Sequence, residues 1–506
     1  MRLQAVIFTL LAAASTTAVQ TTDRSFGALI DCPSVRSADL LCLWVGKNGQ
    51  AVDSRMLREL FIQHNNVADS NRESTLRNLQ QHMTYIEDVH MHAKSVGHKF
   101  SYHMGVNGRH LFLSSNRKLT PEQFVEQELA SAFSRRLQTQ TNSTNSSTIS
   151  RTGGSSKYWN WCDADNSMGH SVCSPVKSQK TCGSCWSFVA ADAIETAVVI
   201  AEKASAAVSL SPQQFLTCSS LQTTQTFEYC WASDGGVPGA SWMQTQIMWE
   251  SQNDGCNGGM THGAFMDAAQ NNWSLVTELT MPYDDENAGG SSAANASSMC
   301  TVGADKAAAS ITGYEQIVGI DCTVSSNCKL LLRLALEKQP IAVAITSNGG
   351  FDDYAGGFYN CPNNGVMASK NDLNHALLLV GYGTDSVHGD YWILKNSYGS
   401  LWGDDGFLKL VADTKINCGL NIFPVIPIGA KAGVQASTTI DSGGDKVFVG
   451  LSPSSWIGVA AATTIFTVVA TAIGMVVSHQ RMKGIREQNP AMYMVASTPT
   501  NAQNAH

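Results

Sequence analysis

The chain has 506 residues, with 33 Lys or Arg and 41 Asp or Glu, which gives a formal net charge of −8. This length predicts two or three domains. The mild acidity and the lack of a basic cluster argue against a nucleic-acid partner. The chain has 14 cysteines, which are many for a reducing compartment and indicate a secreted or endomembrane protein.

The N-terminus has the pattern of a signal peptide. Met1-Arg2 precede an apolar run from Ala5 to Ala14, and small residues follow near Ala18. Residues 1–19 are therefore predicted to direct the chain into the secretory pathway.

Near the other end, Trp456 to Val477 is an uncharged stretch long enough to span a bilayer. Basic residues follow it and acidic residues precede it: Arg481, Lys483 and Arg486, and Asp441 and Asp445. The positive-inside rule predicts a single-pass helix at 454–478 and a cytosolic tail at 479–506, with the preceding residues luminal or extracellular. A GPI signal and a buried core helix are the alternatives. The long polar tail argues against the first, and the lack of a following globular sequence argues against the second.

The segment from Gln179 to Phe188 reads Gln-Lys-Thr-Cys-Gly-Ser-Cys-Trp-Ser-Phe. Apolar residues recur with helical spacing after Cys185, and Gly183-Ser184 predict a turn and a helix N-cap. Cys185 is thus expected in the first helical turn, where unpaired N–H groups and the helix dipole stabilise a thiolate. Gln179 can supply an amide donor for an oxyanion. A lone cysteine in this setting is more often a buried structural residue.

A second pair of polar residues lies on neighbouring predicted strands. Asn374-His375 begins an apolar strand, Ala376 to Val380, and the next strand, Tyr391 to Lys395, ends at Asn396. The His at the start of one strand and the Asn at the end of its neighbour can face each other, as a base and the residue that orients it. Further strands are predicted at 341–345 and 407–411.

The motif around Cys185, the Asn-His-Ala motif and the Lys-Asn-Ser-x-Gly-x-x-Trp-Gly motif from Lys395 together resemble papain-like cysteine proteases. The resemblance runs almost continuously from Tyr158 to about Pro427. It implies an α+β fold of two halves, one helical and one β-barrel-like, with the active site in the cleft between them. It also implies the catalytic roles: nucleophile for Cys185, base and acid for His375, orienter for Asn396 and oxyanion donor for Gln179.

The resemblance further implies which residues contact substrate. Gly258 and Gly259 would present their backbone to an extended peptide. An apolar pocket for the second residue before the cut would be formed by Met260, Thr261, Ala344, Ala376 and Phe423. Ordinary core packing is the alternative for each of these five. In the family, two aromatic residues shield the Asn–His hydrogen bond from water. This chain has Tyr398 at the first of these positions, where the family usually has Trp, and Trp402 at the second. Trp402 is also expected to contact the substrate.

Disulfides implied by the resemblance are Cys182–Cys256, Cys218–Cys300 and Cys361–Cys418. Short spacings suggest Cys32–Cys42, Cys162–Cys173 and Cys322–Cys328, which leaves Cys230 without an assigned partner. Sequence alone does not fix connectivity. Glycosylation is expected at the Asn-x-Ser/Thr sites Asn142, Asn145, Asn272 and Asn295.

Residues 20–133 are expected to be a separate inhibitory prosegment. A helix from Leu76 to Val96 carries an apolar stripe, and Leu119 to Phe124 resembles the end of papain-family propeptides. The family's Phe-x-Asp after Gly-x-Asn is replaced here by Gly108-Arg109-His110. The helix region also carries His82, His90 and His92, interpreted either as a solvated polar face or as a pH sensor.

The predicted order continues with a Ser/Thr/Asn-rich linker at 134–156, a catalytic domain at 157–428 with an insertion at about 219–254, and a juxtamembrane linker at 429–453. The insertion either narrows the substrate cleft or lies away from it.

The predicted function is that of a membrane-anchored peptidase, made as a zymogen. It is expected to be an endopeptidase of an endolysosomal, vacuolar or surface compartment, acting on peptide or protein substrates without a metal or cofactor. The alternatives are a non-catalytic adhesion or receptor ectodomain, and a ligase or transpeptidase using the same acyl-enzyme.

Overall fold

The computed structural model describes residues 26–33, 41–46, 49–111, 119–129, 158–220, 223–232, 242–285, 300–317, 325–347, 350–361, 373–412, 418–420 and 424–434. All of them belong to one compact unit that ends at Ser437. The predicted signal peptide, the linker at 134–156 and the proposed membrane segment at 454–478 lie outside these ranges. Within the described ranges, no helix has the length and apolar character needed to cross a bilayer.

The N-terminal segment folds around one long helix. Its elements are β1 (Leu29–Asp31), β2 (Leu43–Val45), β3 (Ala51–Asp53), α2 (Ser54–His64), α3 (Asp69–Ser95), β4 (Tyr102–Met104) and the short helix η1 (Gly108–Leu111). The predicted apolar stripe on α3 is confirmed, because Leu79, Met83, Ile86 and Val89 are fully buried. Asp53 caps α2 by accepting a hydrogen bond from the Met56 backbone.

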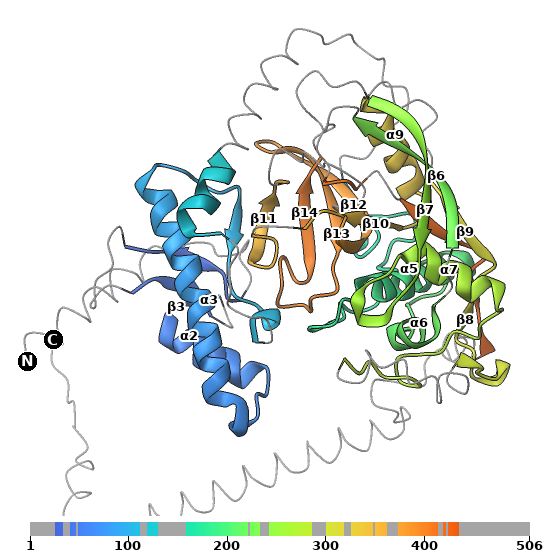
Figure 1. Ribbon diagram of the computed structural model, residues 1–506, viewed down its shortest axis with the longest axis horizontal. Helices are drawn as coiled ribbons and strands as arrows, with labels where there is room; N and C mark the ends of the chain where they lie inside the picture. The colour runs from blue at the N-terminus through green and yellow to red at the C-terminus, as the bar shows by residue number, and fades with distance from the viewer. Residues whose placement is uncertain are drawn as a thin grey trace, which may run out of the picture. The chain divides into compact units, whose positions relative to one another are not determined.

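The helices of the second part are α5 (Cys185–Glu202), α6 (Pro212–Cys218), α7 (Thr261–Gln270) and α9 (Ser325–Leu336), with short helices η2 (Gly255–Asn257) and η3 (Ala304–Lys306). Helix α5 is buried on almost every side from Trp186 to Val199, as expected for a central helix of high apolar content. It contacts α6, α7, β10 and β12 (Figure 1). Because these contacts hold α5 in place, the position of its first residue, Cys185, is fixed.

The strands of this part are β5 (Tyr158–Asn160), β8 (Ala309–Ser310), β9 (Gly313–Gln316), β10 (Ile341–Ile345), β11 (Tyr354–Tyr359), β12 (His375–Asp385), β13 (Gly389–Lys395), β14 (Phe407–Val411), β15 (Val425–Ile428) and β16 (Lys431–Ala432). Among the described residues, the main sheet has the order β4-β11-β14-β13-β12-β10-β15-β9, with β5 paired to β12. The four predicted strands at 341–345, 376–380, 391–395 and 407–411 are confirmed by β10, β12, β13 and β14.

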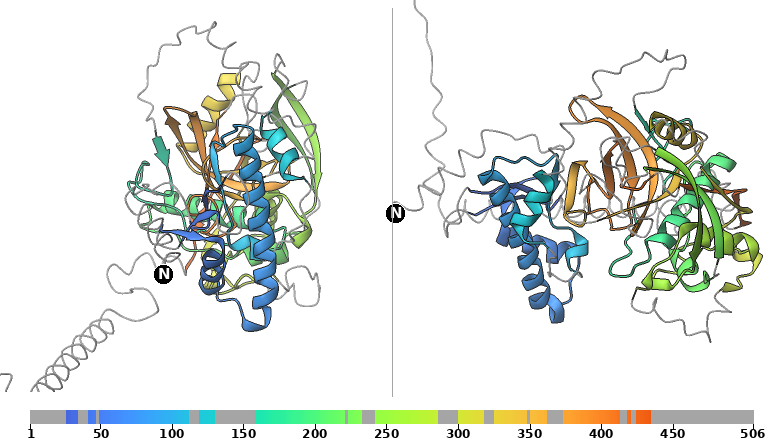
Figure 2. Two further views of the ribbon diagram at one scale, coloured as in Figure 1. Left: turned by 90° about the vertical axis from the view of Figure 1, so that its left-hand side faces the viewer. Right: turned by 45° about the horizontal axis from the view of Figure 1, so that its top comes forward.

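The sheet extends into the N-terminal segment. Strand β4 pairs antiparallel with β11, with Met104 opposite Tyr354 and Tyr102 opposite Gly357. Gly357 has φ +84°, and a Cβ there would lie 2.8 Å from the Tyr102 Cα, so this pairing requires glycine. Figures 1 and 2 show the two parts side by side along β11. The N-terminal segment thus docks by adding β4 to the edge of the main sheet, beside β11.

The insertion contains an antiparallel hairpin of β6 (Thr223–Ala232) and β7 (Trp242–Ser251). Its two ends are tied together, because Asn253 Nδ2 donates to Ser219 Oγ at 2.7 Å and Ser219 Oγ donates to Asp267 Oδ2 at 2.5 Å. Asn253 Oδ1 also accepts from the Met260 backbone at 2.6 Å. The base of the insertion therefore supports a residue expected in the specificity pocket.

Disulfide bonds join the pairs Cys32–Cys42, Cys162–Cys173, Cys182–Cys256, Cys218–Cys300 and Cys361–Cys418. These include the three pairs implied by the resemblance. The suggested Cys322–Cys328 pair involves Cys322, which lies outside the described residues.

Candidate active site

Cys185 is the first residue of α5, and its thiol is free. The preceding loop is held by the Cys182–Cys256 disulfide and by Gly183, whose N–H donates to the Cys256 carbonyl at 3.1 Å. A Cβ on Gly183 would lie 2.4 Å from that carbonyl oxygen, so only glycine fits. Ser184 occupies the N-cap position, but the expected side-chain cap is absent.

The hydroxyl of Ser184 bonds instead to the Tyr283 hydroxyl at 2.9 Å. Its sequence position alone could not reveal this partner, 99 residues away. The backbone N–H groups of the first turn of α5 are therefore not taken by the Ser184 side chain. The Ser187 N–H donates to the Ser184 carbonyl at 2.9 Å, whereas the Cys185 and Trp186 N–H groups act on the Cys185 thiol.

His375 begins β12, and Asn396 directly follows the last residue of β13. Because the two strands are antiparallel neighbours, these ends meet, and His375 Nε2 lies 2.8 Å from Asn396 Oδ1. Both side chains are buried. Asn396 Oδ1 also accepts from the Ser397 backbone at 2.8 Å, which fixes the oxygen toward the imidazole. The geometry suits an orienter that holds the ring plane and its Nε2–H tautomer.

Gln179 is linked to the same turn through Ser397. Its Oε1 accepts from Ser397 Oγ at 2.6 Å, and its backbone N–H donates to the Ser397 carbonyl at 2.8 Å. Its Nε2 donates one hydrogen to the Cys182 carbonyl at 2.8 Å. The second hydrogen of this amide remains for an acceptor in the cavity, which Gln179 lines.

A cavity of about 390 Å³ brings these groups together. It is lined by Gln179, Cys185 and His375 and by six residues expected at the substrate: Gly258, Gly259, Met260, Thr261, Ala344 and Ala376. Phe423 lies outside the described residues. Trp402 does not line the cavity, because its side chain is fully buried and its Nε1 donates to the Phe351 carbonyl at 3.0 Å. Trp402 packs against Phe351 and Tyr398, and its contact with substrate stays a prediction.

Aromatic rings pack against the His375 imidazole, and one of them, Tyr398, also lines the cavity. The Tyr398 ring centroid lies 4.8 Å from that of His375, and Phe351 lies at 5.4 Å. Trp402 packs behind Tyr398, at 5.6 Å. Only 6% of Tyr398 is exposed, so these rings exclude water from the His375–Asn396 bond.

Burial is the largest cause of the pKa shifts of Cys185 and His375. It raises the pKa of the Cys185 thiol, which hydrogen bonds from the Ala376 and Trp186 backbone partly oppose. Burial also lowers the pKa of His375 to about 3, an effect opposed by the bond to Asn396 and reinforced by the charge of Arg109. The covered site therefore favours the neutral thiol and imidazole over the ion pair.

The family model described as "Papain family cysteine protease" matches residues 158–428, more than half of the chain. The chain belongs to the papain family of cysteine proteases. Procathepsin L of Rattus norvegicus is 32% identical over 258 residues, covering 50% of this chain and 61% of that protein. Digestive cysteine proteinase 3 of Homarus americanus is 33% identical over 257 residues, covering 50% and 62%. The alignments thus span about three fifths of these relatives' length.

Among solved structures, digestive procathepsin L 3 of the Tenebrio molitor larval midgut aligns with TM-score 0.46 and 22% identity, over 74% of this chain and 98% of that one. The recombinant stem bromelain precursor has the same values. The papain-like fold of helices and sheet described above agrees with the family match.

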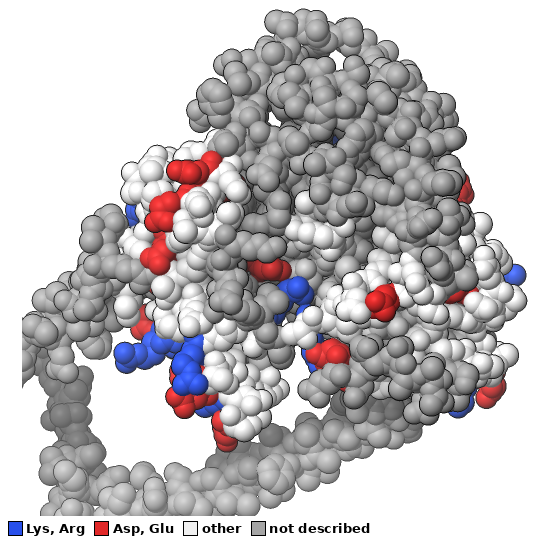
Figure 3. Space-filling model, in the orientation of Figure 1, with Lys and Arg blue, Asp and Glu red and all other residues white. Residues whose placement is uncertain are grey.

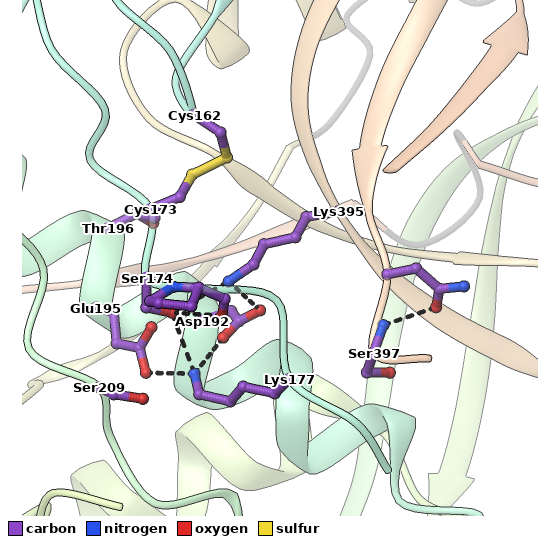
Figure 4. Close-up of polar contacts among 12 residues, drawn as sticks. Cys162, Cys173, Ser174, Lys177, Asp192, Glu195, Thr196, Ser209, Lys395 and Ser397 are labelled. Carbon is purple, nitrogen blue, oxygen red and sulfur yellow. Dashed lines mark hydrogen bonds and ion pairs between the residues drawn. A yellow bond between two sulfur atoms is a disulfide. The ribbon is translucent and has the colours of Figure 1, made fainter. Parts of the chain in front are cut away.

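The papain-family chain also places a buried group of charges behind the site, which the sequence reasoning missed. Lys177 Nζ lies 2.5 Å from Asp192 Oδ1 and 2.6 Å from Glu195 Oε1, and Lys395 Nζ lies 2.8 Å from Asp192 Oδ2. Figure 4 shows both ammonium groups converging on the carboxylates, beside Ser174, whose Oγ accepts from each lysine. All four charged side chains are at most 6% exposed.

This cluster joins three parts of the site. Lys177 is two residues before Gln179, Asp192 lies on the helix that begins at Cys185, and Lys395 precedes Asn396. Burial alone would raise the pKa of Asp192, but the two ammonium groups hold it below its ordinary value. Asp192 is therefore charged and bridges helix and sheet. Lys395 begins one of the motifs quoted from the sequence, and Lys177 lies two residues before the other, but nothing there identified the buried acid that pairs with them.

Proposed function

We propose that this protein is the zymogen of a papain-like cysteine endopeptidase that hydrolyses peptide bonds through Cys185. The observation that supports it most is one cavity that collects Cys185, His375 and Gln179, with the imidazole held 2.8 Å from Asn396. The non-catalytic alternative predicts loss of one of these groups, and the sequence retains all four.

In the proposed reaction, the Cys185 sulfur, paired with the His375 imidazolium, attacks the carbonyl carbon of the scissile peptide. Negative charge develops on the carbonyl oxygen, and the Gln179 side-chain amide and the Cys185 backbone N–H donate to it. His375 gives its proton to the departing amine as the C–N bond breaks, which leaves a thioester on Cys185. Water then attacks the thioester with His375 as base, and the products are the carboxylic acid and the free thiol.

The prosegment, residues 20–133, is proposed to inhibit this site and to be released by a cut in the linker at 134–156. The inhibition is supported by the β4–β11 pairing and by Arg109, which lines the catalytic cavity. Arg109 also makes the covered site still less suited to an imidazolium, because its positive charge lowers the pKa of His375 further. Departure of the prosegment would thus both open the cleft and favour the thiolate–imidazolium pair.

The anchor is a separate proposal that rests on sequence alone. Residues 454–478 form an uncharged run followed by basic residues, and they would hold the catalytic domain on the luminal or extracellular side of a membrane. Extraction of membranes with alkaline carbonate tests this. The full chain is expected in the pellet, and a chain ending at residue 453 is expected in the supernatant. Release of both chains into the supernatant would rule out the anchor.

The catalytic proposal is tested by peptide hydrolysis with the processed full chain. Cys185→Ala and His375→Ala are expected to abolish cleavage, whereas Asn396→Ala keeps a reduced rate, since the orienter improves geometry but does not react. Hydrolysis by purified Cys185→Ala at the wild-type rate would overturn the assignment.

A further inference from the structure

The guanidinium of Arg109 is held by three different groups of the catalytic domain. Its Nε lies 3.2 Å from Asp352 Oδ1, and its Nη1 donates to the Lys180 carbonyl at 3.1 Å. Its Cζ lies 3.9 Å from the centroid of the Tyr398 ring. A carboxylate, a carbonyl and an aromatic face together match a planar, charged guanidinium better than they match any neutral side chain.

The docking of the prosegment does not depend on this side chain alone. The Asn107 side chain donates to the Asp352 carbonyl at 2.7 Å, and the Gly105 backbone donates to the Asp353 carbonyl at 2.7 Å. These contacts use the main chain of the catalytic domain and leave the Asp352 carboxylate to Arg109. They therefore account neither for the Asp352 carboxylate nor for the Tyr398 ring, which lines the cavity together with Arg109.

The position of these groups relative to His375 indicates which part of a substrate they would meet. The proposed apolar pocket includes Ala376, which follows His375 along β12, and Ala344, its partner on β10. Tyr398 lines the same cavity and lies against the ring of His375. Because the imidazole delivers its proton to the departing amine in the proposed reaction, we expect the residue on that side of the cut to lie beside Tyr398.

The attraction for a basic side chain comes from Asp352 itself. Figure 3 shows acidic and basic side chains interspersed over the described part of one face, rather than one continuous acidic field. Even with Arg109 in place, 40% of the Asp352 side chain is exposed. A substrate cation can therefore reach it once the prosegment has left.

We infer that Asp352, the Tyr398 ring and the Lys180 carbonyl form a subsite that selects arginine or lysine as the first residue after the scissile bond. Arg109 occupies this subsite in the zymogen and vacates it on activation. The inference rests on the proposed peptidase function. It adds a substrate preference and two specificity-determining residues, Asp352 and Tyr398, to it.

The test uses the full chain after processing and peptides that differ only in the first residue after the cut: Arg, Lys, Gln or Glu. We expect kcat/KM to fall in that order, with Arg favoured over Gln by about tenfold, as one partly exposed ion pair plus one cation–π contact would give. Asp352→Asn should reduce this ratio to about threefold or less. Asp404→Asn is the matched control, because Asp404 is 41% exposed and pairs with Lys409, so it removes one charge elsewhere and should leave the ratio unchanged.

A second readout does not require cleavage. Binding of the same peptides to the Cys185→Ala chain, followed by fluorescence anisotropy after the prosegment has been removed, should show the same Arg preference and its loss in Asp352→Asn. Equal affinities for Arg and Gln peptides, or a ratio that Asp352→Asn does not alter, would overturn the subsite and reduce Arg109 to a docking contact. A failure of the proposed peptidase function would look different: no peptide would be cleaved, but the Cys185→Ala chain would still bind Arg peptides in preference to Gln peptides.

Discussion

His110 Nε2 lies 2.8 Å from Asp353 Oδ1, and neither side chain is more than 1% exposed. The first belongs to the prosegment and the second to the catalytic domain. The Asn107 backbone donates to His110 Nδ1 at 3.0 Å, so Nε2 carries the hydrogen and donates to the carboxylate. Two consecutive prosegment residues, Arg109 and His110, thus contact two consecutive acids, Asp352 and Asp353, and Arg109 also lines the catalytic cavity.

We predict that His110→Ala weakens docking, because it removes a buried hydrogen bond to a carboxylate, worth about 1.5–3 kcal/mol. The full-length variant should process itself faster than the wild type at neutral pH. His110→Gln, which can still donate to Asp353, should show a smaller effect. Electrophoresis of the purified chains over time measures this, and identical latency of His110→Ala and wild type would contradict it.

A second prediction concerns pH. Burial lowers the pKa of His262 to about 3, from 6.5, and that of His375 likewise to about 3. The folded state then binds fewer protons than the unfolded state, so this stability is complete above about pH 6.5 and is lost as the pH falls toward 3. Each histidine contributes a slope of up to about 1.4 kcal/mol per pH unit.

Urea unfolding of the full chain carrying Cys185→Ala, which cannot cleave itself in the proposed mechanism, measures this between pH 7.5 and 4.5. The free energy of unfolding should fall through this range, and it should fall less steeply when His262→Gln is added. Parallel curves for the two chains would show that His262 does not contribute.

A third prediction concerns the buried charge cluster. Asp192→Asn should lower the free energy of unfolding by about 3–5 kcal/mol, since it leaves two buried lysines with too little negative charge. It should also lower kcat, because Lys395, which pairs with Asp192, directly precedes Asn396. Asp404→Asn, which breaks the exposed pair with Lys409, should cost less than about 1 kcal/mol. Equal losses for the two variants in urea unfolding would argue against the structural importance of the cluster.

Replacing Tyr398 tests how the imidazole is shielded. Tyr398→Trp should keep or modestly raise kcat, because a larger apolar ring excludes more water from the His375–Asn396 bond. Steady-state hydrolysis by the processed chain is the measurement. A tenfold loss, about 1.4 kcal/mol in the barrier, would instead show that the Tyr398 hydroxyl has a task of its own.

The elements around the site could be predicted because their signals are local. Alternating and continuous apolar runs gave the strands β10, β12, β13 and β14, and the helical spacing after Cys185 gave α5. The prosegment stripe was visible for the same reason. These patterns reflect burial of one face or of a whole element, and they need no information about distant partners.

The contacts that tune the site could not be predicted, because they join residues far apart in sequence. The sequence shows that Gly108-Arg109-His110 replaces the Phe-x-Asp of the family. It does not show that Arg109 contacts Asp352 and His110 contacts Asp353, because each acid lies 243 residues further along the chain. The histidine that contacts Asp353 of the catalytic domain is His110, which does not lie on the helix where the sequence drew attention to histidines. His82 packs against His110 with ring centroids 4.6 Å apart, and His90 lies 3.6 Å from Asp31 within the prosegment.

The central claim, that Cys185 is a nucleophile covered by the prosegment, is tested most directly by labelling with an epoxide active-site probe and intact-mass analysis. The full chain should gain one adduct, mapped to Cys185, only after the prosegment has been removed, and Cys185→Ala should gain none. An adduct of equal yield on Cys185→Ala, or no adduct on a processed chain that cleaves peptides, would contradict the account.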